Sequence, residues 1–532
     1  MATTERPSGR SGISFNRVFV VSLVFVAAFG GWGLIDPEGM SATSLGFTNF
    51  MLTGIGWYWL LICTGFLALS GFLAFGPYGH IKLGEDHEEP EFSTTSWIAM
   101  LFAGGMGAGL IFWGVAEPLY HFRSPPGAQI EAGEAARQAL ALTNLHWGLH
   151  AWATYGVCAM VIAYFTFRKK ARPLISTPIE WLFPGATGRR LGEVANVLGV
   201  FAVVFGLAGS LTMGTLQIRA GLGELIGSPL DFTMSLVIMA VMYATYMTSA
   251  AVGVDRGIKL LSNINMVVAV LLMLFIISFG PTAFIFETFI DSIGQYVTRL
   301  PALAFHLYPF EGLQAWTASW TLTYLIWWLA WGPFVGIFIA RISRGRTIRE
   351  FCAGVIVAPT LFSMFWFATF GGAGFFLELY GPGGIAELVF QDVTRALFVF
   401  LDAFPLGTLL GFVALFLIYI FLVTSADSGS FVLSMMTSEG KLDPPIAYKM
   451  VWGTLVAVLT VATLFSGSVE VAKAMAVTGA VPFSVVLLLQ IIGFLRAIRS
   501  ERAAPPNERA APPVAAPPVA AAPADQPARA AR

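Results

Sequence analysis

Aromatic side chains cluster in the stretch 146–155, HWGLHAWATY, in the middle of an apolar segment. On an ideal helix, Trp147, Trp152 and Tyr155 share one wide face. A second stretch, 327–331 (WWLAW), places two tryptophans three residues apart on one face. Aromatic faces attract cations by up to about 2 kcal/mol per desolvated contact, and a quaternary ammonium group has no N–H with which to bind otherwise. The pattern favours a cation cage, with interface anchoring or core packing as the alternative.

Glycines interrupt another apolar stretch, 97–116, at the sequence GGMGAG (104–109). Each glycine costs roughly 1 kcal/mol against alanine inside a helix. Unwound backbone is tolerated at membrane depth only where it faces protein or a watery cavity. Freed N–H groups suit an anion and freed carbonyls suit Na⁺, so these glycines predict a binding site. Close helix packing is the alternative explanation.

Polar side chains in other apolar stretches extend this set. In 421–428 (FLVTSADS), the hydroxyls of Thr424 and Ser425 are hard oxygen ligands suited to an alkali cation. Their alternative role is to hydrogen-bond to the preceding helical turn. Asp427 and Glu117 are acids within or near apolar stretches, which makes them functional candidates.

One histidine pair allows a different chemistry. His146 and His150 have the i, i+4 spacing of metal ligands. The chain lacks an HExxH glutamate beside them, so an intramembrane metalloenzyme using this pair with Glu117 is a remote alternative. We expect no enzyme activity.

Composition defines the class of protein that must position these residues. The chain has 532 residues, of which 56% are hydrophobic and only 11% charged, and its mean hydropathy is +0.74. These values exclude an ordinary soluble enzyme. The net charge of −1 gives no indication of nucleic-acid binding. Stretches of about 20 apolar residues occur at roughly 18–36, 51–75, 97–120, 140–167, 194–217, 233–252, 262–286, 317–340, 352–376, 404–431, 447–466 and 475–495.

The sequence thus predicts an all-α polytopic membrane protein with twelve transmembrane helices. With that count, 24 of the 30 Lys and Arg residues lie on the side of both termini. The positive-inside rule then places both termini in the cytoplasm, and we expect a multi-pass protein of the cell (inner) membrane.

Two apolar stretches with Gly/Pro interruptions occupy matching positions. One contains the glycine cluster, and the other contains Gly332-Pro333. Each begins a block of five spans, so the blocks run in opposite senses, which is typical of inverted-repeat transporters. The expected segments are a cytoplasmic N-terminus (1–16), two helices with an acidic loop (17–96), the first repeat (97–288), a surface amphipathic helix with its loop (289–315), the second repeat (316–496) and a disordered Ala/Pro-rich cytoplasmic tail (497–532).

Four motifs resemble the betaine/carnitine/choline transporter family. They are AGGMGAG (103–109), HWGLHAWATY (146–155), WWLAWGPF (327–334) continuing as VGIFIARISRGRTIREF (335–351), and FLVTSADS (421–428). The resemblance covers roughly residues 15–495 and is strongest to Na⁺-coupled glycine betaine transporters. It implies a ten-helix, leucine-transporter-like core preceded by two extra helices, a homotrimer, and uptake of trimethylammonium compounds.

The resemblance also implies the site residues. The aromatic box would be Trp147, Trp152, Tyr155 and Trp328, with Trp327 and Trp331 contacting substrate along its route. The glycine stretch would contribute Met106, Gly107, Ala108 and Gly109. One Na⁺ would bind at Ala103, Met106, Phe421, Thr424 and Ser425, and a second near Ser210 and Phe334.

Two further positions bear on ion and substrate. Asn265 stands where the carnitine-exchanging branch carries an Arg that replaces sodium, so Na⁺ coupling is expected. Gly109 stands where members that favour choline carry an Asp, which favours a substrate with its own carboxylate. We therefore expect Na⁺-coupled import of a zwitterionic osmolyte, glycine betaine first, serving osmoprotection, with no cofactor besides Na⁺. The alternatives are choline, carnitine or dimethylsulfoniopropionate as substrate, and H⁺ coupling or exchange.

Overall fold

The computed structural model of the chain describes residues 15–105, 107–127, 130–252 and 255–503. Within these ranges the chain forms helices and loops and no strand; Lys82 and Thr347 pair in an isolated β-bridge. A helix satisfies its backbone hydrogen bonds internally, which is why so apolar a chain adopts this structure. The predicted all-α class is confirmed.

Eleven helical stretches in the described ranges are long and apolar enough to cross a membrane. In chain order they comprise α1 (Arg17–Ile35), α3 (Gly56–Phe75), α6 with α7 (Ala132–Trp147, Leu149–Ala163), α9 (Ala186–Ile226), α10 (Phe232–Val252), α11 (Asp255–Phe279), α13 with α14 (Gln314–Thr317, Thr323–Ile342), α15 with α16 (Ile348–Cys352, Ala358–Leu379), α19 (Gly407–Thr437), α20 (Ile446–Leu464) and α21 (Val469–Ala503). The remaining expected span, 97–120, consists of two shorter helices, α4 (Thr94–Gly105) and α5 (Ala108–Arg123). The glycine stretch therefore does interrupt its helix, as predicted.

Other helices are shorter or more polar. They are α2 (Pro37–Gly54), α8 (Thr177–Leu182), α12 (Thr282–Leu303), α17 (Ile385–Gln391) and α18 (Ala396–Asp402), with single π-helical turns at Tyr164–Arg168, Ala318–Leu322 and Ala353–Val357. Helix α12 confirms the helix expected around 289–299.

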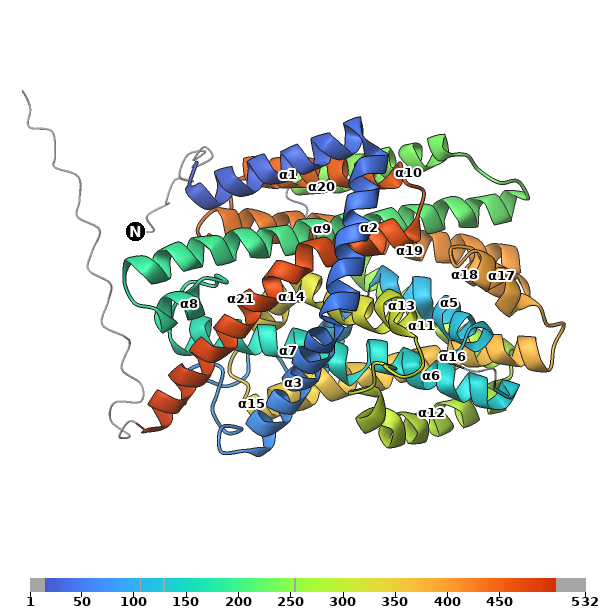
Figure 1. Ribbon diagram of the computed structural model, residues 1–532, viewed down its shortest axis with the longest axis horizontal. Helices are drawn as coiled ribbons and strands as arrows, with labels where there is room; N and C mark the ends of the chain where they lie inside the picture. The colour runs from blue at the N-terminus through green and yellow to red at the C-terminus, as the bar shows by residue number, and fades with distance from the viewer. Residues whose placement is uncertain (1–14, 106, 128–129, 253–254, 504–532) are drawn as a thin grey trace, which may run out of the picture.

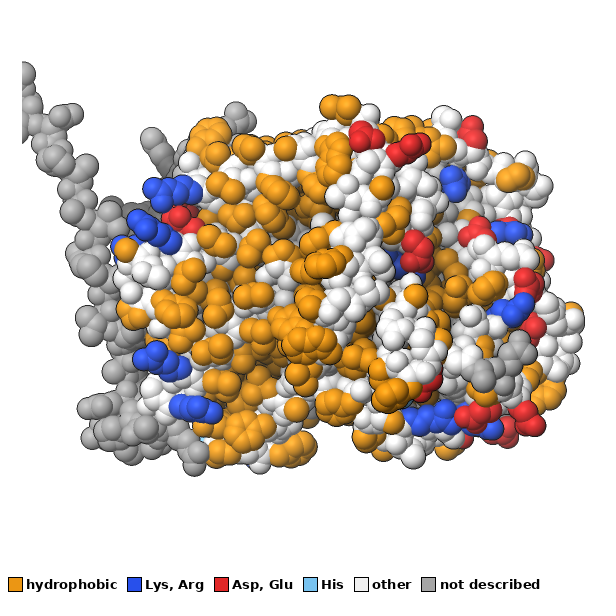
Figure 2. Space-filling view, in the orientation of Figure 1, with side chains coloured by type: hydrophobic (Ala, Val, Ile, Leu, Met, Phe, Trp, Pro, Cys, Tyr) orange, Lys and Arg blue, Asp and Glu red, His pale blue; other side chains and the backbone are white. Residues whose placement is uncertain are grey.

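Figure 1 shows α14 in the middle of the bundle, where α7, α9 and α21 pack against it. Helix α12 lies along one edge, on α16 and α6 (Figure 1). In Figure 2 hydrophobic side chains cover the middle of the visible face, and most charged side chains lie toward its two ends. This distribution is typical of a surface whose middle faces hydrocarbon. The inverted repeat and the count of twelve crossings stay predictions.

The interruption expected at Gly332-Pro333 is wrong. Helix α14 runs without a break from Thr323 to Ile342, with Pro333 inside it. A proline removes one backbone donor, but a membrane helix continues where its neighbours hold both halves. The helices packed around α14 supply that support.

A break that the sequence analysis did not predict lies at Gly148, between α6 and α7. The Leu149 N–H donates to the Tyr296 hydroxyl of α12 at 3.1 Å. A Cβ on Gly148 would lie 2.3 Å from the Asn144 carbonyl oxygen and 2.8 Å from the Tyr296 hydroxyl oxygen. A side chain larger than that of glycine does not fit at this bend without a shift of the backbone. The bend also lies between Trp147 and Trp152, so these two residues do not share the continuous helix face that the sequence analysis expected.

We expect Gly148→Ala to destabilise the protein, because backbone must move to admit the methyl group; overpacking of this kind costs about 1–3 kcal/mol. The measurement is thermal unfolding of the purified protein in detergent. Gly65→Ala in α3 is the matched control, since a Cβ there meets nothing within 4 Å. Equal melting temperatures for the two variants would contradict the prediction.

Candidate functional site

A cavity of about 870 Å³ lies inside the bundle between α5, α9, α14 and α19. Most of the residues predicted from the sequence line it: Gly107, Ala108, Gly109, Trp147, Tyr155, Ser210, Trp327, Trp328, Trp331, Phe334, Phe421, Thr424 and Ser425. The structure thus brings together residues from distant parts of the chain. Met106 and the side chain of Ala103 lie outside the described residues.

Three aromatic rings form perpendicular walls at this cavity. The ring centroids of Trp147 and Trp328 are 5.1 Å apart at 82°, and those of Tyr155 and Trp328 are 5.3 Å apart at 89°. Trp152 differs from the prediction: it is 3% exposed and packs behind the wall, against Tyr155 at 5.8 Å. A set of ring faces at right angles can surround a compact cation.

Tyr324 also lines the cavity and was not predicted. Its ring contacts Trp147 at 5.7 Å and stacks toward Trp327 at 6.3 Å. It precedes Trp328 by four residues, so helical spacing could have placed it on the same face.

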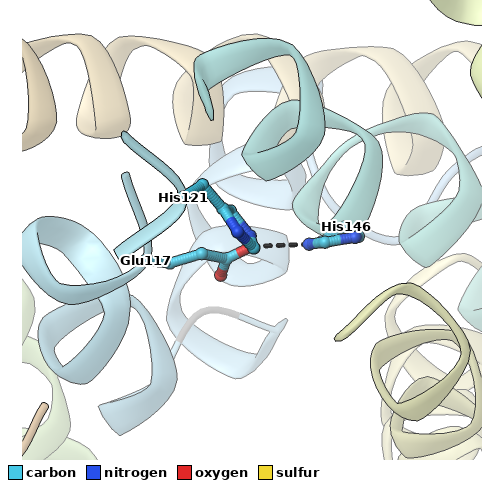
Figure 3. Close-up of side chains that lie close together, drawn as sticks. All are labelled: Glu117, His121 and His146. Carbon is cyan, nitrogen blue, oxygen red and sulfur yellow. Dashed lines mark hydrogen bonds and ion pairs between the residues drawn. The ribbon is translucent and has the colours of Figure 1, made fainter. Parts of the chain in front are cut away.

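Hydrogen bonds from two indole N–H groups fix the orientation of the cage. Trp147 Nε1 donates to Glu117 Oε2 at 2.7 Å, and Trp328 Nε1 donates to the His146 carbonyl at 2.7 Å. The His146 ring nitrogen Nδ1 is itself 2.6 Å from Glu117 Oε1 (Figure 3). The fully buried Glu117 thus helps to position both tryptophans. It accepts from Trp147 directly, and it contacts His146, whose carbonyl accepts from Trp328.

Gly109 lies directly beneath the Trp147 ring. A Cβ at this position would lie 2.8 Å from Trp147 Cη2 and 3.3 Å from Cζ3. Any larger residue at position 109 would therefore have to displace the Trp147 ring, whatever its charge.

The hydroxyl-bearing wall of the cavity belongs to α19. The Thr424 hydroxyl donates to the carbonyl of Ile420 at 2.9 Å or of Phe421 at 3.2 Å, which is the back-bonding role considered above. Because the hydroxyl proton is directed at these carbonyls, the Thr424 oxygen keeps lone pairs that can coordinate a cation. Asp427, which the sequence predicted as a functional candidate, also lines the cavity from this helix and adds a carboxylate.

The two ends of the cavity differ. At one end it reaches Leu442, Asp443 and Lys449, on the side where the sequence predicts the cytoplasm. At the other end Trp113 contacts Trp320 at 5.7 Å and Tyr324 at 5.9 Å. The structure is therefore open toward one side and closed by aromatic packing toward the other.

The histidine pair considered for a metalloenzyme does not form a cluster. His150 Nε2 lies 3.2 Å from the Thr64 hydroxyl, whereas His146 groups with Glu117 and His121. His121 was missed, although its i, i+4 spacing from Glu117 is visible in the sequence.

A multi-pass helical protein with a ligand cavity reached from one side has the architecture of a membrane transporter. Comparison with known proteins identifies the family. Residues 17–503 match the family described as "BCCT, betaine/carnitine/choline family transporter", and the chain belongs to this family.

Curated relatives agree over most of the chain. It is 42% identical to the glycine betaine transporter OpuD of Bacillus subtilis (strain 168), over 91% of this chain and 94% of the relative. It is 39% identical to the ectoine/hydroxyectoine transporter of Virgibacillus pantothenticus, over 91% and 96%. The glycine betaine transporter of Acinetobacter baylyi is 35% identical, over 91% and 73%. These names indicate a transporter and not an enzyme.

We expect Glu117→Gln to loosen the cage, because a neutral amide oxygen accepts from the Trp147 N–H more weakly than a carboxylate, and because His146 must change tautomer to accept from the amide N–H. Hydrogen bonds to charged groups contribute about 1.5–3 kcal/mol, against about 0.5–1.5 kcal/mol for neutral pairs. Thermal unfolding should show this loss, and acrylamide should quench tryptophan fluorescence more strongly than in the parent protein. Glu387→Gln, which alters an exposed partner of Arg123, is the control. A Glu117 variant that matches this control in both measurements would refute the positioning role.

Proposed function

We propose that the protein imports a zwitterionic trimethylammonium osmolyte, glycine betaine first, by Na⁺-coupled alternating access. The observation that carries this proposal is the perpendicular arrangement of Trp147, Tyr155 and Trp328 beside the interrupted helix at 105–108. Such a site offers ring faces at one end and backbone amides at the other.

The ammonium end of the substrate would bind between the three rings. The positive charge of a trimethylammonium group is spread over its methyl groups. Each ring face that it contacts therefore contributes a cation–π attraction of about 2 kcal/mol where water is excluded. The indole N–H groups point away to Glu117 and the His146 carbonyl, which leaves the ring faces for the substrate.

The carboxylate end would bind at the start of α5. This helix begins at Ala108, and a Cβ on the preceding Gly107 would meet nothing within 4 Å, so the backbone there is open to the cavity. The first N–H groups of a helix have no intrahelical partners and favour an anion. The uncharged Gly109 in the same turn adds no repulsion.

Sodium would bind between the interrupted helix and α19, at Ala103, Met106, Phe421, Thr424 and Ser425. A second ion near Ser210 and Phe334 would lie against the same cavity, between α9 and α14. Asn265 is fully buried and donates to the Leu417 carbonyl of α19 at 3.3 Å. Asn265 is not among the cavity-lining residues, but its neutral side chain puts no fixed positive charge beside α19, which supports sodium over a fixed cation.

In this proposal the structure represents the inward-facing state of a transporter in the cell (inner) membrane, with both termini cytoplasmic. A homotrimer and a role in osmoprotection belong to the same proposal. The relative named as an ectoine transporter favours a second candidate, because a cyclic zwitterion with a delocalised cation suits the same ring faces and amides.

Uptake of radiolabelled glycine betaine into proteoliposomes tests substrate and ion together. We expect uptake driven by an inward Na⁺ gradient, and competition by ectoine, choline, carnitine and dimethylsulfoniopropionate ranks the alternatives. Thr424→Ala should raise the half-saturating Na⁺ concentration at least tenfold. Ser430→Ala removes an equally back-bonded hydroxyl of α19 outside the cavity and serves as control. Undiminished uptake without Na⁺ would refute the coupling, and absent uptake would refute the substrate.

Replacing Gly109 tests how the site distinguishes betaine from choline. We expect Gly109→Asp to shift preference toward choline, because its carboxylate repels that of betaine and attracts choline. Gly109→Ala introduces the same Cβ against Trp147 without charge, so it isolates the steric effect. Competition binding should show a betaine-to-choline affinity ratio at least tenfold lower for Asp than for Ala. Equal ratios in the two variants would refute the hypothesis that charge at position 109 distinguishes betaine from choline.

A further inference from the structure

A second cluster of polar side chains lies behind the cage, outside the cavity lining. Glu117 and His121 are one turn apart on α5, and His146 is the penultimate residue of α6. All three are fully buried. Figure 3 shows the side chains converging, and one ligand atom from each lies within 4.8 Å of the others.

His121 is the unusual member. Among the described residues, neither of its ring nitrogens has a hydrogen-bond partner; Nε2 lies 3.5 Å from Glu117 Oε1. Its ring is held between Trp320 at 4.5 Å and Trp316 at 5.4 Å. Buried polar groups are almost always hydrogen-bonded, so an immobilised imidazole that has a long contact to a carboxylate but no hydrogen bond among the described residues indicates a missing partner.

We propose that Glu117, His121 and His146 bind a borderline divalent transition-metal ion, with Zn²⁺ as the reference occupant. Two imidazoles and one carboxylate are a donor set that Zn²⁺ prefers, and nitrogen donors distinguish this site from the oxygen sites of Na⁺. The ligand atoms would be Glu117 Oε1, His121 Nε2 and His146 Nδ1.

The surrounding hydrogen bonds can accommodate the ion. Metal binding at His146 Nδ1 requires its proton to move to Nε2, which lies 2.9 Å from the Thr321 hydroxyl and would then donate to it. The Thr321 hydroxyl turns from donor to acceptor, so the imidazole stays neutral and no proton is lost. Glu117 keeps Oε2 for the bond from Trp147, because only Oε1 is engaged.

The charge balance also permits a cation. Glu117 supplies one negative charge at the cluster. The ammonium of Lys473 lies 4.4 Å from the Trp320 ring centroid, on a ring that also contacts His121. Glu470 pairs with that ammonium at 3.0 Å, which offsets its repulsion of a bound metal.

The test uses the purified full chain in detergent, stripped with chelator and titrated with Co²⁺ alone, whose visible absorption reports nitrogen ligands and low coordination number. We expect one Co²⁺ per chain, displaced by Zn²⁺. His121→Phe fills the ring space without metal-binding nitrogens and should weaken binding at least tenfold and abolish the band. His150→Gln, at another buried histidine, should leave the Co²⁺ affinity and the absorption band unchanged.

If His121→Phe does not yield folded protein, His121→Gln replaces it with the same expectation. A parent protein that gives no band, or a His121 variant with the band and affinity of the parent, would overturn the proposal. The readout needs no transported substrate, so failure of the proposed transport function would not affect it.

Discussion

The buried carboxylate of Glu117 is the group on which the orientation of the cage depends. One oxygen accepts from Trp147 and the other contacts His146, whose carbonyl holds Trp328. An indole attracts a cation only when its face is turned to the ligand, so these bonds determine whether the cage can work. At membrane depth an unpaired carboxylate is costly, which keeps the network together as a unit.

Backbone breaks create the groups that this network uses. A helix that ends leaves its last carbonyls without intrahelical partners. Because α6 ends just before Gly148, the His146 carbonyl is among these groups, and Trp328 of α14 donates to it. The N–H freed on the other side of the break, that of Leu149, donates to Tyr296. The bend at Gly148 therefore helps to set the orientation of Trp328. The interruption before α5 supplies backbone amides on the other side of the cavity.

Sequence reasoning succeeded where the signal is local and failed where it is not. The helical class and the interruption at 104–109 follow from composition and clustered glycines. The break at Gly148 does not, because it depends on Tyr296, distant in the chain. The interruption expected at Pro333 was wrong for the same reason, because helices distant in the sequence pack against α14 and support a continuous helix there. Glu117 was visible as a buried acid, but its partners could be assigned only from three-dimensional proximity.

Aromatic and charged side chains pack against one another at the closed end of the cavity. Trp113 and Trp320 meet at 5.7 Å, and the Lys473 ammonium lies 5.0 and 4.4 Å from their ring centroids. Aromatic pairs contribute about 0.5–1.5 kcal/mol each, so the transport cycle proposed above would need little energy to separate these rings. In the proposed cycle, the Glu117 network stays intact while these outer rings separate, because breaking it would expose a buried charge.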